Sequence, residues 1–125
     1  MFTGIVQETG TVLALRELGS NSIQIDIDCK SINEKSALGD SVCISGICLT
    51  VEVKEINSLT FTAISETVNK TNIDKFKTGQ LVNVEESATA NTLIGGHPIT
   101  GHVDVTSEVL NIIENEVWKT IRFKL

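Results

Sequence analysis

Apolar and polar residues alternate in short runs along this chain, and turn-forming residues separate one run from the next. An alternation with a period of two residues is typical of a strand with one buried face. Such runs occupy residues 23–27, 42–44, 48–53, 59–63 and 81–84. The pattern predicts an antiparallel barrel or sandwich with little helix. We favour a small all-β barrel, because closure removes the exposed edges of a short sheet.

The segments between these runs predict the connections. Ser45-Gly46 lies between two β-favouring runs, so a tight hairpin is expected there. Residues 65–76 have near-helical spacing of their apolar positions, which predicts either a short helix or a pair of turns. Single turns are expected within residues 31–35 and 90–94.

Length and charge exclude several classes of protein. A chain of 125 residues suits one domain. Its 10 basic and 16 acidic residues give a net charge of −6 with no basic cluster, so a nucleic-acid partner is not expected. No apolar run approaches the roughly 20 residues that cross a bilayer. The first residues lack the pattern of a signal peptide, and we expect a cytoplasmic protein with no membrane partner.

The cysteines favour a reducing compartment. Their number is odd, three, which suits free thiols better than a disulfide framework. Cys43 and Cys48 lack the spacing of a zinc or redox pair, and the chain has only two histidines. We therefore expect no metal site.

An internal repeat divides the chain. Thr3-Gly4-Ile5-Val6 recurs 97 residues later as Thr100-Gly101-His102-Val103, and the strand pattern that follows matches in register. The repeat predicts one whole module over residues 1–98 and the beginning of a second, incomplete copy over residues 99–125.

Seven short motifs occur in the order and with the gaps of one known family. They are Met1-Phe-Thr-Gly-Ile-Val6, Gly39-Asp-Ser-Val42, Gly46-Ile-Cys-Leu-Thr-Val51, Ser65-Glu-Thr67, Thr71-Asn72, Val82-Asn-Val-Glu85 and Gly95-Gly-His-Pro-Ile-Thr-Gly-His-Val103. Together they span the first module and closely resemble the N-terminal half of riboflavin synthases.

The resemblance implies two tandem six-stranded antiparallel Greek-key barrels, called lumazine-binding domains, with one or two short helices; this chain covers the first barrel. Family members are trimers that convert two molecules of 6,7-dimethyl-8-ribityllumazine into riboflavin and 5-amino-6-(ribitylamino)uracil by four-carbon transfer. They use no cofactor. One substrate lies in the N-terminal barrel of one subunit, and the other lies in the C-terminal barrel of its neighbour. An isolated barrel could pair as a dimer.

The resemblance also singles out three candidate catalytic residues. His102 replaces the apolar Ile5 of the first repeat, and it is a candidate for proton transfer or ring positioning, or else a structural histidine at the junction. Cys48 is a pocket-wall contact and a weaker candidate nucleophile, because no basic neighbour is evident and buried cysteines usually act as small apolar residues. Ser41 offers a hydroxyl that is otherwise an ordinary turn hydroxyl.

The substrate-binding residues implied by the resemblance come from four segments. They are Phe2, Gly4, Ile5 and Val6; Cys48, Leu49 and Thr50; Thr62, Ala63, Ile64, Ser65, Glu66 and Thr67; and Gly101, His102 and Val103. Gly4 would permit close approach to a flat ligand, or form a bulge in a long first strand. Glu66 and Thr67 could grip ribityl hydroxyls or cap the helix that follows.

Two residues depart from the family pattern. Ser45 stands where the family usually has Asn, and Glu86 where it usually has Arg, which reverses a charge. The alternative function is that of a non-catalytic lumazine- or flavin-binding protein of the antenna type, which shares this barrel. Tight binding without turnover would favour that alternative.

Overall fold

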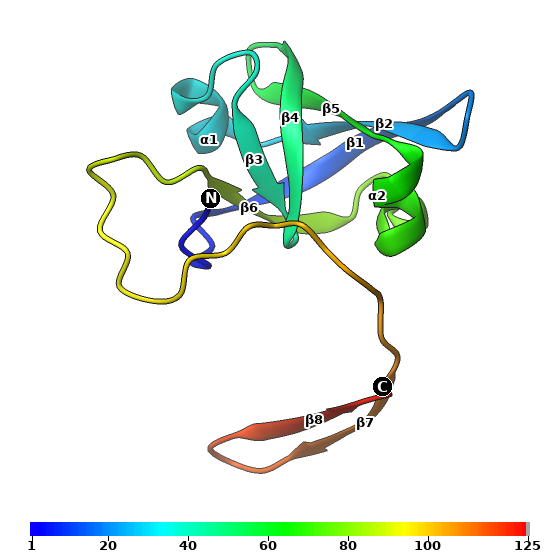
Figure 1. Ribbon diagram of the computed structural model, residues 1–125, viewed down its shortest axis with the longest axis vertical. Helices are drawn as coiled ribbons and strands as arrows, with labels where there is room; N and C mark the ends of the chain where they lie inside the picture. Colours follow the sequence, from blue (N-terminus) through cyan, green and yellow to red (C-terminus); the bar gives the residue numbers. More distant parts are fainter. Residues whose placement is uncertain (125) are drawn as a thin grey trace.

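The computed structural model describes residues 1–124, and its main body is a closed barrel of six antiparallel strands (Figure 1). The strand order around the barrel is β1-β2-β5-β4-β3-β6. The predicted all-β barrel is therefore confirmed. The strands are β1 (Glu8–Leu18), β2 (Ser22–Asp28), β3 (Ser41–Ile44), β4 (Ile47–Lys54), β5 (Ser58–Ala63) and β6 (Leu81–Glu86).

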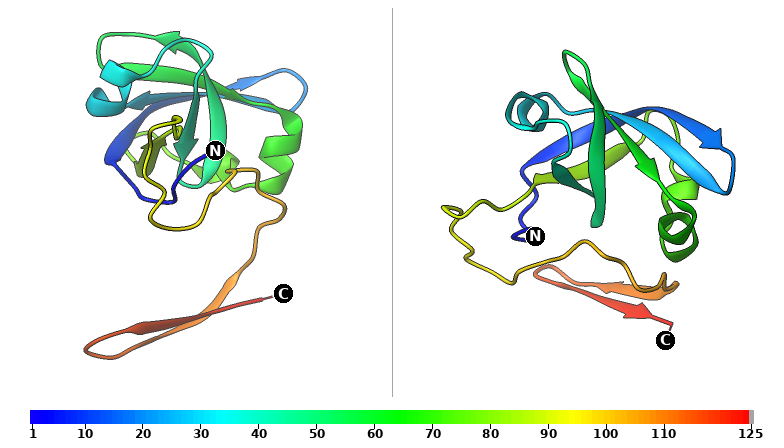
Figure 2. Two further views of the ribbon diagram at one scale, coloured as in Figure 1. Left: turned by 60° about the vertical axis from the view of Figure 1, so that its left-hand side comes forward. Right: turned by 45° about the horizontal axis from the view of Figure 1, so that its top comes forward.

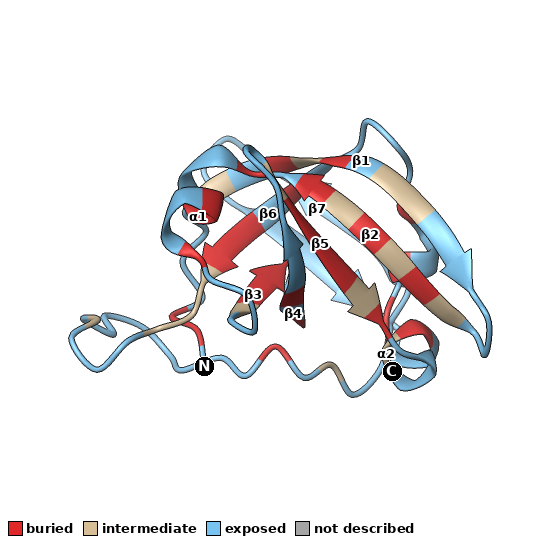
Figure 3. Cartoon of the chain, turned by 90° about the horizontal axis from the view of Figure 1, so that it is seen from above, coloured by how far each residue is buried: buried red, intermediate tan, exposed pale blue. Residues whose placement is uncertain are grey.

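The alternation seen in the sequence separates the inside of the barrel from the outside (Figure 3). Along β2 the three isoleucines at positions 23, 25 and 27 are buried, and the residues between them are less so. Ile25 lies opposite Phe61 of β5, which in turn lies opposite Val51 of β4. All three side chains belong to the hydrophobic core. Burial of these apolar faces is the main force that holds the strands together.

A two-residue turn joins β3 to β4, as the sequence predicts. Ser45 and Gly46 have φ angles of 47° and 90°, and Ile44 pairs with Ile47 on either side. Two successive positive φ angles are the mark of a type I′ turn, whose twist matches that of the strands. The turn fixes the register of the hairpin and so the position of Cys48 near its tip.

Short helices fill the remaining connections. The expected turn within residues 31–35 is the helix α1 (Lys30–Lys35), whose first amides donate to the Glu8 carboxylate. The expected helix or pair of turns within residues 65–76 consists of α2 (Ser65–Lys70) and the 3-10 helix η1 (Ile73–Lys75). The expected turn within 90–94 is present at its start. No helix in the described part of the chain is long and apolar enough to cross a membrane.

The chain ends in a separate hairpin, which lies apart from the barrel in Figures 1 and 2. Its strands are β7 (Val109–Glu114) and β8 (Lys119–Phe123), and every residue of both strands is exposed. In the repeat, β7 corresponds to β1 and β8 to β2. The two hairpins also share an irregularity in register, after Val12 in β1 and after Val109 in β7, which is the same place in each copy.

Candidate functional site

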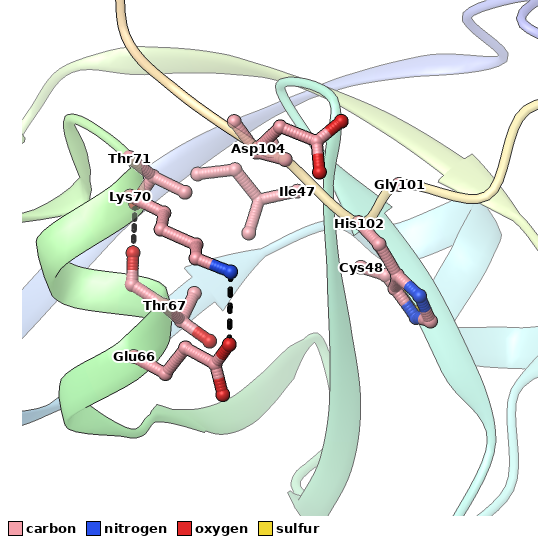
Figure 4. Close-up of a pocket in the computed structure, with 10 residues that line it drawn as sticks. Ile47, Cys48, Glu66, Thr67, Lys70, Thr71, Gly101, His102 and Asp104 are labelled. Atoms are coloured by element: carbon pink, nitrogen blue, oxygen red, sulfur yellow. Dashed lines mark hydrogen bonds and ion pairs between the residues drawn. The ribbon is translucent and has the colours of Figure 1, made fainter.

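A cavity of about 380 Å³ opens at one end of the barrel, between the start of β4, the helix α2 and the chain that follows the barrel (Figure 4). We call residues 99–104 the crossing segment, because they run across the barrel past the tip of the β3–β4 hairpin. The lining residues are Ile47, Cys48, Glu66, Thr67, Lys70, Thr71, Gly101, His102, Val103 and Asp104.

The crossing segment is held against β4 by its backbone. The Cys48 N–H donates to the Gly101 carbonyl at 2.9 Å. Gly101 has a φ of +75°, and a Cβ at this position would lie 2.8 Å from the Cys48 Cβ. Only glycine combines this conformation with so close an approach. Val103 packs against the hydrophobic core and anchors the next part of the segment.

The helix α2 forms the opposite wall. Val68 turns into the core, so Glu66, Thr67 and Lys70 face the cavity. The Lys70 Nζ lies 2.9 Å from the Glu66 carboxylate, one helical turn away, and both side chains are exposed. The hydrogen bond with Lys70, together with its charge, lowers the pKa of Glu66. The same contact raises the pKa of Lys70, with a smaller contribution from Asp104.

These walls place hydrogen-bond donors and hydrogen-bond acceptors around one opening. Lys70 donates, Glu66 and Asp104 accept, and the Thr67 hydroxyl can do either. The Cys48 thiol is half-buried and His102 is exposed. Such a rim suits a neutral ligand that carries several hydroxyl or carbonyl groups.

The cavity brings together six of the residues predicted from the sequence, namely Cys48, Glu66, Thr67, Gly101, His102 and Val103. Leu49 and Ala63 are buried in the barrel core. Thr62 donates its hydroxyl to the Glu52 carboxylate at 2.7 Å. The remaining predicted residues of these segments are exposed and do not line the cavity, although each lies close in the sequence to a residue that does: Thr50, Ile64 and Ser65.

The predicted residues at the N-terminus lie elsewhere. Phe2 is fully buried, Ile5 is exposed, and Gly4 and Val6 line a second cavity of about 300 Å³. Gly4 precedes β1 and has a φ of +79°, so the alternative of a bulge within a long first strand is wrong. Phe2 forms an isolated bridge with Ile99.

Ser41 lies in neither of these two cavities. It begins β3 and lines a cavity of about 160 Å³ that also includes Lys35 and Glu86. Its carbonyl accepts a hydrogen bond from the Ser87 hydroxyl at 2.6 Å. Glu86, where the family usually has Arg, lies 3.7 Å from the Lys35 Nζ. The structure thus keeps Ser41 apart from the cavity that holds Cys48 and His102.

Four lining residues were not predicted from the sequence: Ile47, Lys70, Thr71 and Asp104. Lys70 lies four residues after Glu66, a spacing that predicts an ion pair on a helix and was available as a signal. Asp104 directly follows the repeated motif. Ile47 and Thr71 belong to the family motifs at residues 46–51 and 71–72, but the resemblance did not single them out as binding residues. Within residues 1–124, no three His, Cys, Asp or Glu side chains form a group that could hold a metal ion.

Known proteins resemble the chain in sequence. The family model of the lumazine binding domain matches residues 3–87. Riboflavin synthase of Bacillus subtilis (strain 168) is 41% identical over 114 residues, which are 91% of this chain and 53% of that protein. Riboflavin synthase of Mycobacterium tuberculosis (strain ATCC 25618 / H37Rv) is 34% identical over 126 residues, 100% of this chain and 62% of that protein. The chain spans little more than half the length of these curated relatives.

Solved structures resemble it over its full length. The crystal structure of LumP complexed with 6,7-dimethyl-8-(1'-D-ribityl) lumazine has a TM-score of 0.87 and 27% identity, and the match covers 100% of this chain and 69% of that one. LumP complexed with riboflavin has a TM-score of 0.86 and 26% identity, with coverage of 100% and 67%. The predicted resemblance to riboflavin synthases is confirmed, and this chain belongs to the lumazine-binding domain family.

Proposed function

We propose that this chain is the N-terminal, substrate-binding half of a riboflavin synthase. Its ligand would be 6,7-dimethyl-8-ribityllumazine or riboflavin, bound in the cavity between β4, α2 and the crossing segment. One observation carries the proposal: Cys48, Glu66, Thr67 and His102 come from three separate parts of the chain and line one cavity. These are also positions that the family motifs imply for substrate binding.

The reaction asks little of a protein in the way of acid–base chemistry. One lumazine transfers a four-carbon unit to a second lumazine, which becomes riboflavin, and the donor is left as 5-amino-6-(ribitylamino)uracil. The C7 methyl group of the lumazine is acidic because its carbanion delocalises into the ring. Holding two such rings face to face turns a bimolecular step into a nearly unimolecular one. A cavity of about 380 Å³ is at the small end of the range for small-molecule sites and suits one substrate. The second ring would come from another barrel.

The proposed roles follow from position. His102 would position the ring or move a proton, and Cys48 would form the wall beneath it. Glu66 and Thr67 would bind ribityl hydroxyls, with Lys70 as a further donor. The catalytic role of Ser41 stays a prediction from the family motif, as do the contacts of the N-terminal residues.

A complete site would require assembly. The full-length protein would form a homo-oligomer, a trimer by analogy with the family, and two isolated barrels could pair as a dimer. We further propose a cytoplasmic location, with no resident cofactor and neither nucleic acid nor membrane as partner.

The test is to incubate the chain with 6,7-dimethyl-8-ribityllumazine and to follow lumazine fluorescence and riboflavin formation against a no-protein control. Saturable binding supports the proposed site, and riboflavin formation adds turnover by single barrels. If turnover occurs, His102→Gln should lower it by about 10²-fold, as expected for loss of acid–base help. Cys48→Ser, a change at the same wall, should leave it within about threefold, because a contact residue contributes uniformly to binding. A chain that binds neither lumazine nor riboflavin would contradict the proposal.

A second function has one observation in its favour. The LumP structures match the whole of this chain and are complexed with lumazine, riboflavin or flavin mononucleotide. A non-catalytic carrier would bind one of these ligands without converting it. Saturable binding with intact lumazine, in a protein that also contains a second barrel, would favour the carrier.

A further inference from the structure

A buried carboxylate near the end of β6 holds the start of the chain. Glu85 is 5% exposed, and one of its carboxylate oxygens, Oε1, receives three hydrogen bonds. The Thr3 N–H donates at 2.6 Å, the Thr3 hydroxyl at 2.7 Å and the Gly4 N–H at 3.0 Å. Bonds to a carboxylate are stronger than those between neutral groups, and a buried carboxylate depends on them. Glu85 therefore fixes the path of residues 1–4, which we call the N-terminal segment.

The N-terminal segment in turn holds the crossing segment. The Phe2 N–H donates to the Ile99 carbonyl at 2.7 Å, and the Ile99 N–H donates to the Phe2 carbonyl at 2.9 Å. Gly4 lies so close to the Ile99 side chain that a Cβ on Gly4 would be 3.2 Å from it. Residues 93–98, just before the bridge, are all exposed. After these exposed residues, the two backbone hydrogen bonds between Phe2 and Ile99 hold the chain in place.

Two residues beyond Ile99, the chain reaches the ligand cavity. Gly101 accepts the hydrogen bond from Cys48, and His102 and Val103 line the cavity. A continuous series of contacts therefore leads from Glu85 through Thr3 and Ile99 to the cavity wall.

We infer that Glu85 is a positioning residue for the ligand cavity: by holding the N-terminal segment it sets the crossing segment, and with it His102, against β4. Glu85 does not line that cavity itself. The inference rests on the proposed function only for the identity of the ligand.

The first measurement is the dissociation constant for 6,7-dimethyl-8-ribityllumazine, obtained by fluorescence titration. Glu85→Ala removes the acceptor and should raise the dissociation constant by about tenfold, which corresponds to about 1.4 kcal/mol. Glu85→Gln keeps an acceptor oxygen and should stay within about threefold of the wild type. Val82→Ala is the matched control, because it loses buried volume from the same strand at a position that pairs with Gly10 of β1. It should lower the melting temperature and leave the dissociation constant within about twofold.

The second measurement needs no ligand. Hydrogen exchange of the Cys48 amide reports the bond to Gly101, and the Phe61 amide in the core serves as the global reference. Glu85→Ala should speed exchange at Cys48 by about tenfold relative to Phe61, whereas Val82→Ala should change both amides together. If Glu85→Ala does not fold, Thr3→Val removes one of the three donors and should shift Cys48 exchange in the same direction by a smaller factor.

The outcomes separate the two proposals. If the wild type binds neither lumazine nor riboflavin, the proposed function fails and Cys48 exchange alone decides the role of Glu85. An unchanged Cys48 exchange in a folded Glu85→Ala or Thr3→Val variant would overturn the inference. So would a Glu85→Ala variant that binds lumazine as tightly as the wild type.

Discussion

Three thiols in this chain have different surroundings. Cys29 is buried beside the start of α1, and burial, reinforced by the charges of Glu8 and Asp28, raises its pKa to about 12. Burial also raises the pKa of Cys43. Cys48 is half-buried at the cavity. Since the thiolate is the reactive form, the first two thiols are protected both by access and by protonation.

Iodoacetamide at about pH 8 should therefore label Cys48 first, and saturating lumazine should slow that labelling. Cys29 has a raised pKa, so its thiolate becomes abundant only as the pH approaches about 12. Peptide mass spectrometry over time would measure the rates at each cysteine. Labelling of Cys29 in the folded chain as fast as at Cys48 would contradict the prediction.

The charges around the cavity predict a preference between ligands. Lys70 is the one lysine or arginine among the ten lining residues, and it is already paired with Glu66, while Asp104 adds a second carboxylate. A phosphate at the end of the ribityl chain would meet net negative charge. Riboflavin should bind more tightly than flavin mononucleotide, by about three- to tenfold at low salt and less at high salt.

Variants test the origin of this preference. Asp104→Asn should narrow the difference between the two flavins, and Lys70→Gln should widen it. Lys77→Gln is the control, since it changes the net charge equally and does not line the cavity. Fluorescence titrations at two salt concentrations would provide the ratios. A wild-type chain that prefers the phosphorylated flavin would refute the electrostatic explanation.

At the scale of elements, the sequence predicts the pieces that are determined locally. The alternation around Ile25 identifies β2, and Ser45-Gly46 identifies the hairpin, because each depends on neighbours in sequence. The pairing of β3 with β6 has no such local signal. Nor does the bridge between Phe2 and Ile99, which joins the two ends of the barrel module. Closure of the barrel sets the pairing of β3 with β6, and closure is a property of the whole sheet. The bridge lies outside the barrel strands and depends on where the fold brings residues 2 and 99.

The β3–β4 turn gives a prediction about stability. Gly46 has a φ of +90° and open space around its Cα, so Gly46→Ala adds backbone strain without a clash. We expect a loss of about 1–2 kcal/mol in the free energy of unfolding. Gly19→Ala, also in open space but without a positive φ, should stay within about 0.5 kcal/mol. Urea denaturation followed by circular dichroism would compare them, and equal losses would contradict the explanation.

At the scale of the molecule, the family motifs predicted six of the ten lining residues of the cavity. They did so because the motifs carry information about a site that periodicity alone does not contain. The motifs could not predict the hydrogen bonds that hold the N-terminal segment and, through it, the crossing segment. Glu85 and Thr3 are 82 positions apart, and a buried carboxylate cannot be recognised before the fold places it. The position of Ser41, in a different cavity from Cys48, also depends on tertiary structure.

The crossing segment makes a prediction for shortened chains. A chain of residues 1–98 keeps all six barrel strands but lacks Gly101, His102 and Val103. It should fold as a barrel and bind lumazine at least about tenfold more weakly than the full chain, because one wall is missing. A chain of residues 1–104 should bind within about threefold of the full chain, since the exposed β7–β8 hairpin adds nothing to the cavity. Equal binding by both shortened chains would contradict this role of the crossing segment.

The crossing segment also has a consequence for how such proteins can be recombined. The sequence predicts that a second copy of the module begins at residue 99, yet Gly101, His102 and Val103 line the cavity beside β4 and α2. In that arrangement, the boundary of the predicted repeat precedes the end of the cavity lining by a few residues. A hybrid joined at residue 98 would pair one parent's barrel with the other parent's wall, whereas a junction after Asp104 would transfer the cavity intact. Barrels of this kind are therefore best exchanged at a junction after Asp104, and not at the boundary of the sequence repeat.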